Sequence, residues 1–281
     1  MIINSMSLKA TINNYAKQHK IAPQVVLQNY LFEQFLERIA ASEFCNKLII
    51  KGGLLISSLV GLDTRSTMDL DTTLCHIRLT PENVETIVRK ICAIDIDDDI
   101  NFSFKSIEEE RKNDRYGGFC VKMTANYGSI TAAMSIDMTT GDVITLMPIE
   151  YNYGKMFESD QYIKLWAYNL ETVLAEKMET VLSRSVLNTR IRDYYDIYVL
   201  TTTQNIDYET FAKALQATAI HRGSWENIKD STRIIETIAV NPNLKILWNQ
   251  YRKKFSYAKD IEFESIIKQF VIVCKSVFPK E

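Results

Sequence analysis

The feature that most constrains the fold is a glycine pair, Gly52-Gly53, between two apolar segments. The strand-like run Leu48-Ile49-Ile50 precedes the pair, and a short helix-like segment from Leu54 to Val60 follows it. Glycine lets the backbone turn tightly and approach a ligand closely, because no Cβ stands in the way. Backbone N–H groups at such a turn are suited to binding a phosphate. This stretch therefore predicts a buried strand, a tight turn and a helix that form an anion-binding corner.

Two aspartates follow this corner. Arg65-Ser66-Thr67 leads into Met68-Asp69-Leu70-Asp71. Residues i and i+2 of a strand point to the same face, so Asp69 and Asp71 should stand side by side. Adjacent carboxylates repel each other unless a cation lies between them, and Mg²⁺ commonly binds one or two carboxylates together with substrate phosphates. The pattern therefore favours a metal site, and an exposed polar strand after a β-turn is the alternative.

Composition places the chain among ordinary globular proteins. It has 281 residues, of which 46% are hydrophobic and 24% charged, and its formal net charge of −2 gives no global basic footprint for nucleic acid. The five cysteines form no C-x-x-C pair and the three histidines lie far apart, which favours a reduced cytoplasmic protein without zinc. The N-terminus lacks a signal-peptide core, and no run reaches the ~18 apolar residues of a membrane span. We therefore expect no membrane association.

Periodicity predicts the elements along the chain. Residues 24–44 carry apolar side chains at every fourth position, which indicates a helix. Residues 47–51 are a short buried strand, residues 80–91 a helix that begins at Thr80-Pro81, and residues 93–150 a series of strands and turns. From about residue 165 onward, one helical pattern follows another.

These patterns predict an α+β fold of two parts. Residues 1–160 form a mixed sheet with helices that bears the active site, and residues 161–281 form a helical domain that completes it. No internal repeat and no linker rich in Gly, Ser or Pro separates the parts, so they should pack closely.

A further aspartate, Asp137, interrupts the apolar strand from Met134 to Met138. A charge in such a strand is unfavourable unless it is paired or bound to a metal. From the residues alone, a metal ligand and a strand-end aspartate before the turn at Gly141 are equally favoured.

Residues 176–196 contain a second set of charges. Glu176-Lys177 lies within an apolar helical pattern, and Arg190, Arg192, Asp193 and Asp196 open the next helix. From the residues alone, a salt-bridge network between two helices is the favoured interpretation, although exposed pairs of this kind contribute little stability.

These motifs resemble those of a known family. Lys51-Gly52-Gly53 followed by Arg65-Ser66-Thr67-x-Asp69-Leu70-Asp71 is similar to the AbiEii/AbiGii toxin group of the DNA polymerase β-like nucleotidyltransferases. These are the toxin halves of type IV toxin–antitoxin systems that give abortive phage infection. Leu174-Ala175-Glu176-Lys177, Arg184 and the run from Arg190 to Asp196 resemble the family's E-K…R…R-D-x-x-D block, so the resemblance covers most of the chain.

The resemblance implies nucleotidyl transfer with two Mg²⁺ ions, on a polymerase β-like N-terminal domain. Asp69 and Asp71 would hold Mg²⁺ against the phosphates of an NTP. The superfamily has a third carboxylate on a later strand. Asp137 fits that position, to hold the second metal or act as a base, and Asp142 is the runner-up.

The resemblance also implies contacts with the nucleotide. Lys177 would neutralise charge on the leaving pyrophosphate, and Asp193 or Asp196 would orient this lysine or an arginine, or contact the nucleotide. The residues expected to bind nucleotide are Gly52, Gly53, Ser57, Thr67, Lys177 and Arg190.

The family further implies a toxin that arrests growth, with a cognate antitoxin encoded nearby. GTP or a pyrimidine nucleotide is the expected donor, and tRNA is the expected acceptor. Two alternatives remain: a regulator that binds NTP or GTP without transfer, and a metal-dependent RNA nuclease. The paired carboxylates argue against a pure binder, and the glycine corner and Lys177 favour an NTP donor over hydrolysis.

Two other charged segments have simpler interpretations. Residues 94–99 contain a second D-x-D pattern without a glycine pair upstream, and like charges in a row are typical of a solvated face. Residues 251–254, Tyr-Arg-Lys-Lys, lie beside Phe255 and Tyr257 and could bind RNA by charge and stacking, but a solvated helix end is favoured.

Overall fold

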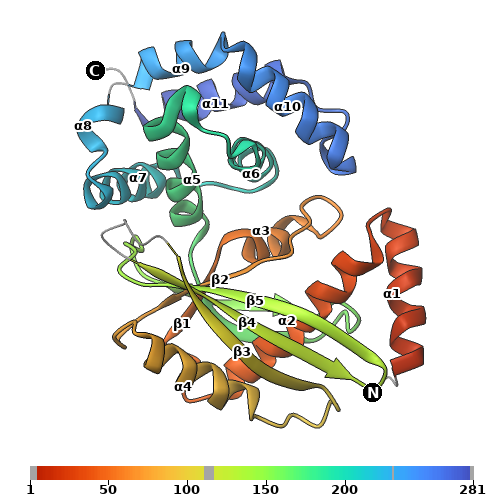
Figure 1. Ribbon diagram of the computed structural model, residues 1–281. Coiled ribbons are helices and arrows are strands. Elements are labelled where there is room, and N and C mark those ends of the chain that lie inside the picture. The colour runs from red at the N-terminus through yellow and green to blue at the C-terminus, as the bar shows by residue number, and fades with distance from the viewer. Residues whose placement is uncertain (1–4, 111–116, 230, 279–281) are drawn as a thin grey trace. The chain divides into compact units, whose positions relative to one another are not determined.

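The computed structural model describes residues 5–110, 117–229 and 231–278. In these residues the chain forms a mixed seven-stranded sheet and a set of helices, which confirms the α+β fold expected from the sequence (Figure 1). None of the helices in this part of the chain is long and apolar enough to cross a membrane.

The elements have the following bounds. The strands are β1 (Leu48–Lys51), β2 (Leu70–Leu74), β3 (Asn101–Glu110), β4 (Gly118–Tyr127), β5 (Ile130–Thr139), β6 (Ile149–Gly154) and β7 (Tyr162–Ala167). The helices are α1 (Ser5–His19), α2 (Pro23–Ala41), α3 (Gly52–Val60), α4 (Pro81–Cys92), α5 (Leu170–Arg184), α6 (Ile191–Thr203), α7 (Tyr208–Arg222), α8 (Trp225–Ile228), α9 (Ser231–Ala239), α10 (Pro242–Lys254) and α11 (Phe263–Val277), with short 3-10 helices η1 (Ser185–Leu187) and η2 (Ser256–Ala258).

The chain divides into two compact units. Among the described residues, unit 1 takes those up to Asp142 together with Ile149–Ala167, and unit 2 takes Val143–Pro148 and those from Tyr168 onward. Unit 1 extends beyond residue 160, the boundary expected from the sequence. Its last strand, β7, pairs in parallel with β1 and antiparallel with β6.

The sheet of unit 1 runs in the order β3-β4-β5-β2-β1-β7-β6. Its centre is mixed, because β2 is antiparallel to β1 and parallel to β5. Side chains alternate between the two faces of a strand. One face of β2 carries Leu70, Thr72 and Leu74, all at most 1% exposed, and Asp71 and Thr73 therefore point to the other face.

Helices cover both faces of this sheet. Figure 1 shows α2 and α4 on one face and α3 on the other. The local sequence explains the helix starts: Pro23 opens α2 at its first turn, and the Thr80 side chain accepts a hydrogen bond from the Asn83 N–H at the start of α4. The apolar positions predicted in residues 24–44 include Phe35, which packs edge-on against Phe102 of β3.

Unit 2 is helical and is built around α5. Asn169 caps this helix by accepting the Thr172 N–H, and its side-chain amide donates to the Thr145 carbonyl. Thr145 also donates its N–H to the Thr172 hydroxyl, so the segment Val143–Pro148 is tied to the start of α5. Because capping satisfies N–H groups that the helix leaves open, the same residues fix both the helix start and this segment.

Candidate active site

The centre of the sheet presents a polar strip on the α3 face. Lys51 of β1 lies opposite Asp71 of β2, and Asp71 lies opposite Asp137 of β5. Register partners on neighbouring strands point to the same face. Two of the predicted metal ligands, from distant parts of the sequence, are therefore neighbours.

The backbone of the glycine pair contacts the Asp71 carboxylate closely. The Gly53 N–H donates to Asp71 Oδ2 at 3.2 Å. Gly52 has a φ of +65°, and a Cβ built on it would lie 2.1 Å from the same oxygen. No other residue type fits there, because the backbone conformation favours glycine and the space is already filled. The start of α3 thus provides an N–H group and the positive end of a helix to the carboxylate.

Asp69 lies just outside the strand. The structure starts β2 at Leu70, so Asp69 occupies the connection before it and is exposed. Its N–H donates to the Thr67 hydroxyl at 3.3 Å, and the Thr67 carbonyl accepts from Asn29 of α2 at 2.8 Å. Thr67 is 2% exposed. The sequence predicted both aspartates within one strand; in the structure Asp71 lies in β2, and Asp69 directly precedes its first residue, Leu70.

Asp137 lies among other acidic groups. Burial raises the pKa of Asp137, a hydrogen bond from Cys120 lowers it, and the carboxylates of Asp71, Glu110 and Asp69 raise it further. Ligand atoms of Glu110, Cys120 and Asp137 lie within 4.8 Å of one another. A hard divalent cation relieves the repulsion between neighbouring carboxylates, and the oxygen atoms of Asp71 and Asp137, which are register partners, are the ligand type that Mg²⁺ prefers, whereas the Cys120 sulfur is not.

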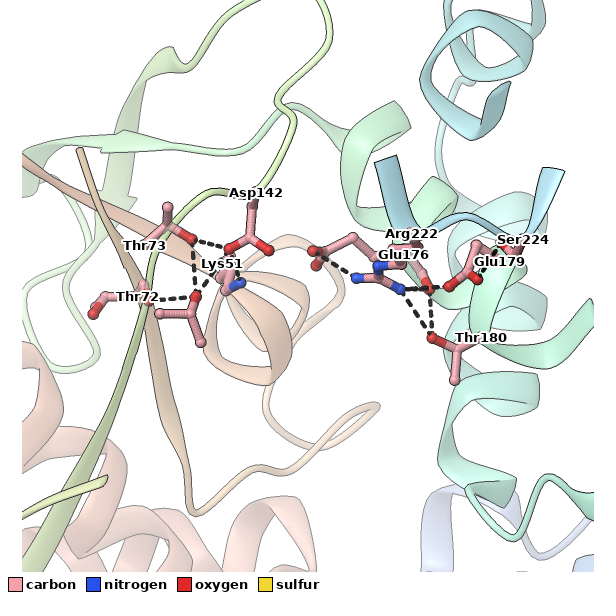
Figure 2. Close-up of polar contacts among 10 residues, drawn as sticks. Lys51, Thr72, Thr73, Asp142, Glu176, Glu179, Thr180, Arg222 and Ser224 are labelled. Atoms are coloured by element: carbon pink, nitrogen blue, oxygen red, sulfur yellow. Dashed lines mark hydrogen bonds and ion pairs between the residues drawn. The ribbon is translucent and has the colours of Figure 1, made fainter. Parts of the chain in front are cut away.

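Asp142, the runner-up for the third carboxylate, has a different environment. Its Oδ2 forms an ion pair with Lys51 Nζ at 2.6 Å and accepts from the hydroxyls of Thr73 and Thr139 at 2.7 and 2.9 Å (Figure 2). Burial alone would raise the pKa of Asp142, but the Lys51 ammonium and these hydrogen bonds lower it to about 2. Asp142 is thus the counter-charge of Lys51. Lys51 was not placed in the site from the sequence, although a lysine at the end of a buried strand, directly before the glycine pair, indicated a buried charge that needs a partner.

Asp142→Ala should lower the free energy of unfolding by about 3–5 kcal/mol, because it leaves the buried Lys51 ammonium without a counter-charge. Urea unfolding measures this loss. The double variant Lys51→Met/Asp142→Leu should recover most of the stability, since it removes both charges. If folded Asp142→Ala protein lost all transfer at unchanged stability, Asp142 would instead be the third carboxylate.

In unit 2, Lys177 of α5 lies between two aspartates of α6. Lys177 Nζ is 2.9 Å from Asp193 Oδ1 and 2.6 Å from Asp196 Oδ2. The side chains are 14%, 12% and 0% exposed, respectively. Asp193 and Asp196 are three residues apart on a helix and so share a face. Both aspartates, and not one of them, hold the lysine.

A second network in unit 2 joins α5 to the end of α7. Arg222 contacts Glu176 at 3.1 Å and Glu179 at 2.6 Å, and the Ser224 hydroxyl donates to Glu179 at 2.7 Å (Figure 2). Sequence reasoning did not connect Arg222 with this block, because the two lie more than forty residues apart. Glu176, next to Lys177 in sequence, is therefore paired with Arg222.

The other predicted nucleotide-binding residues differ in accessibility. Ser57 lies within α3 and is 4% exposed, whereas Arg190 is exposed immediately before α6. The Arg190 N–H donates to the Asn188 side-chain oxygen at 3.0 Å. Arg190 is therefore open to a ligand from solvent, and Ser57 is covered by protein.

The two segments set aside in the sequence have structural contacts. In the second D-x-D segment, Asp98 receives two hydrogen bonds from Arg38, at 2.8 and 2.6 Å. In the basic–aromatic segment, Tyr251 is 9% exposed and its ring packs against Phe255, with centroids 4.7 Å apart. The Arg192 guanidinium lies 5.7 Å from the Phe255 ring centroid. Asp98, Tyr251 and Phe255 therefore each have a structural contact within the fold.

A glycine corner fitted to one of several clustered carboxylates defines a site suited to metal-assisted chemistry on phosphates. Residues 34–269 match the sequence model of the nucleotidyl transferase AbiEii toxin of type IV toxin–antitoxin systems. The chain therefore belongs to the AbiEii family, which confirms the resemblance seen in the sequence. Membership makes it a nucleotidyltransferase toxin with a nucleotide substrate and a cognate antitoxin.

Solved structures show weaker likenesses. A candidate nucleotidyltransferase from H. pylori is 15% identical, with 92% of this chain and 96% of that chain covered and a TM-score of 0.49. JHP933 from Helicobacter pylori is 14% identical, with 92% and 93% covered and a TM-score of 0.49. An antigenic nucleotidyltransferase-like protein from Paracoccidioides brasiliensis is 18% identical, with 80% and 92% covered and a TM-score of 0.35. No curated protein sequence matches this chain significantly. The family assignment therefore rests on the family's sequence model.

Proposed function

We propose that the chain transfers a nucleotidyl group from an NTP to a hydroxyl group of tRNA, and that this modification arrests growth. The observation that carries the proposal is the register of Asp71 with Asp137 beside the glycine corner. Burial raises the pKa of Asp137 and the neighbouring carboxylates raise it further, and a divalent cation would relieve the repulsion between these carboxylates. GTP or a pyrimidine nucleotide is the proposed donor. Because tRNA and nucleotides are cytoplasmic, the proposal places the activity in the cytoplasm.

The proposed metal ligands are Asp69, Asp71 and Asp137. Mg²⁺, when bound there, supplies positive charge that neutralises the triphosphate and lowers the pKa of the acceptor hydroxyl. As an alternative to holding metal, Asp137 would act as the base that accepts the proton of this hydroxyl, because burial and the neighbouring carboxylates raise its pKa in the metal-free protein. The acceptor oxygen bonds to the α-phosphorus, the bond from that phosphorus to the bridging oxygen of the β-phosphate breaks, and pyrophosphate leaves.

The proposed phosphate contacts are two sets of residues. Gly52, Gly53 and Thr67 border Asp71 and Asp69, where backbone groups can approach a phosphate. We assign Lys177 to the leaving pyrophosphate, with Asp193 and Asp196 orienting its ammonium group. Exposed Arg190 is a further proposed nucleotide contact, whereas burial makes Ser57 the weakest member of the set.

Lys177→Ala should weaken NTP binding about tenfold or more and slow transfer, because the variant loses the cation that meets the phosphates. Lys177→Arg should retain part of the binding and less of the rate, since guanidinium has a different geometry from ammonium. Equilibrium binding of an NTP and single-turnover transfer measure the two effects. Lys213→Ala, which removes an exposed lysine paired with Glu209, is the matched control. Wild-type affinity and rate in Lys177→Ala would refute the phosphate role.

One experiment separates this function from its alternatives. The protein is incubated with labelled NTPs, Mg²⁺ and total tRNA, with Asp71→Asn protein as the control. Label on tRNA that depends on Asp71 supports nucleotidyl transfer. Shortened tRNA would instead indicate a metal-dependent RNA nuclease, and NTP binding with unchanged tRNA would indicate a regulator without transfer activity. Omitting one NTP at a time identifies the donor.

A further inference from the structure

Unit 1 contains a cavity of about 790 Å³ apart from the candidate active site. Residues of α2, of the turn at 96–98 and of the β6–β7 hairpin line it. None of the residues proposed for metal or nucleotide binding belongs to this lining. Its volume falls in the range of ordinary small-molecule sites.

The lining is predominantly acidic. Its carboxylates are Glu33, Glu37, Asp97, Asp98 and Glu158, against the two ammonium groups of Lys155 and Lys164. Some of these charges are already compensated: Lys155 contacts Glu37 at 2.5 Å and Glu158 at 3.5 Å, and Arg38 pairs with Asp98. The remaining negative charge favours a cationic ligand.

Glu33 is the most deeply buried acid of this lining. It is only 3% exposed, and it accepts hydrogen bonds from the Met156 N–H at 2.6 Å and from the Gln34 amide at 3.1 Å. Within the described residues, no cationic group lies within 4.0 Å of its carboxylate. Burial raises the pKa of Glu33 to about 7, although the Met156 hydrogen bond and Lys155 lower it. Ionising a carboxyl group at this depth is therefore unfavourable, and a ligand cation beside Glu33 would offset that cost.

Aromatic rings stand beside these acids. Tyr30 and Phe157 both line the cavity, with ring centroids 5.5 Å apart. Tyr162 also lines it and is 60% exposed. Aromatic rings attract ammonium groups through their faces and pack well against methylene chains. Acids interleaved with rings therefore suit a ligand that alternates charged nitrogens with short alkyl chains.

We propose that this cavity binds a linear aliphatic polyamine, with one ammonium group paired to Glu33 and the chain lying along Tyr30 and Phe157. A hydrated metal ion matches the negative charge but makes no use of the rings. A neutral aromatic compound would leave Glu33 uncompensated. The site is separate from nucleotidyl transfer, so it stands independently of the function proposed above.

Calorimetric titration of the full chain with spermidine at physiological ionic strength tests the proposal. Wild-type protein should bind one spermidine, and Glu33→Gln should weaken binding at least tenfold, because the variant keeps the shape and removes the charge. Ala41→Phe should weaken binding to a similar extent, since Ala41 lines the cavity and is exposed, and a ring there fills space without changing any charge. Glu236→Gln, at an exposed position of α9, is the matched control for a lost surface acid and should bind as wild type.

Three results would overturn the proposal. These are an absence of spermidine binding to wild-type protein, equal binding by the Glu33→Gln and Glu236→Gln variants, and displacement of spermidine by Mg²⁺ at equal charge concentration. Circular dichroism and urea unfolding show whether each variant is folded. If Glu33→Gln does not fold, Ala41→Phe decides the question alone, because unchanged affinity in that variant places the ligand outside the cavity.

Discussion

Asp71→Asn is expected to reduce nucleotidyl transfer by at least about three orders of magnitude and to abolish growth arrest. Asparagine has the same shape and keeps an oxygen that can accept the Gly53 N–H, so the glycine corner should remain intact. The variant loses the negative charge that would hold Mg²⁺ opposite Asp137. Because one member of a repelling group of carboxylates is neutralised, its thermal stability should equal or exceed that of the wild type. Single-turnover assays with labelled NTP, together with thermal unfolding, measure both effects.

Asp95→Asn is the matched control for this variant. Asp95 belongs to the other D-x-D pattern of the chain and is exposed, and its side chain caps the local turn by accepting the Asp97 N–H. It should leave transfer unchanged within about twofold. Growth arrest at the wild-type level by folded Asp71→Asn protein would rule out the proposed metal site.

Asp137→Asn should separate binding from chemistry. NTP affinity should largely survive, because Asp69, Asp71 and Lys177 remain, while the chemical step should fall by orders of magnitude. The physical reason is that Asp137 lies in register with Asp71 and would supply either the second metal's ligand or the base. Equilibrium NTP binding and the single-turnover rate, measured on the same preparation, distinguish the two effects.

The pH profile gives an independent test of the role of Asp137. Burial and the neighbouring carboxylates raise its pKa, and only the ionised form can bind a metal or accept a proton. At subsaturating Mg²⁺ the wild-type rate should therefore fall as the pH decreases, at pH values above the usual aspartate range near 3.9, because protons compete with the metal for Asp137. Asp137→Asn should lose this acidic limb along with most of the rate. A nearly silent Asp137→Asn variant with an unchanged profile would reduce Asp137 to a structural strand residue.

Local sequence predicted the corner of the site. The apolar run, the glycine pair and the apolar segment correspond to β1, the turn and α3, because each depends on neighbouring residues only. The helical periodicity of residues 24–44 and the proline at its start likewise gave α2 within a few residues. The strand β2 begins at Leu70, directly after Asp69, whereas the sequence predicted that Asp69 belongs to the strand.

Partners of charged residues were less predictable. Lys177 and the two aspartates of the Arg-Asp block are close in sequence and lie on consecutive helices, so a network between them could be expected. The sequence could not decide between Asp193 and Asp196, and the structure uses both. It also could not show that Lys51 belongs to Asp142, or Arg222 to Glu176 and Glu179.

The sequence by itself determined the family and the α+β class, and it singled out the aspartates that we propose for the site, because these follow from local periodicity and short motifs. Only the tertiary structure decided that Asp71 and Asp137 are neighbours, and that Asp142 is instead the counter-charge of Lys51. The pairing of β2 with β5 joins segments more than sixty residues apart, and many strand pairings satisfy the same alternation of apolar and polar residues. A shift of one residue in that register would turn Asp137 to the opposite face of the sheet, so the site depends on packing that no local pattern encodes.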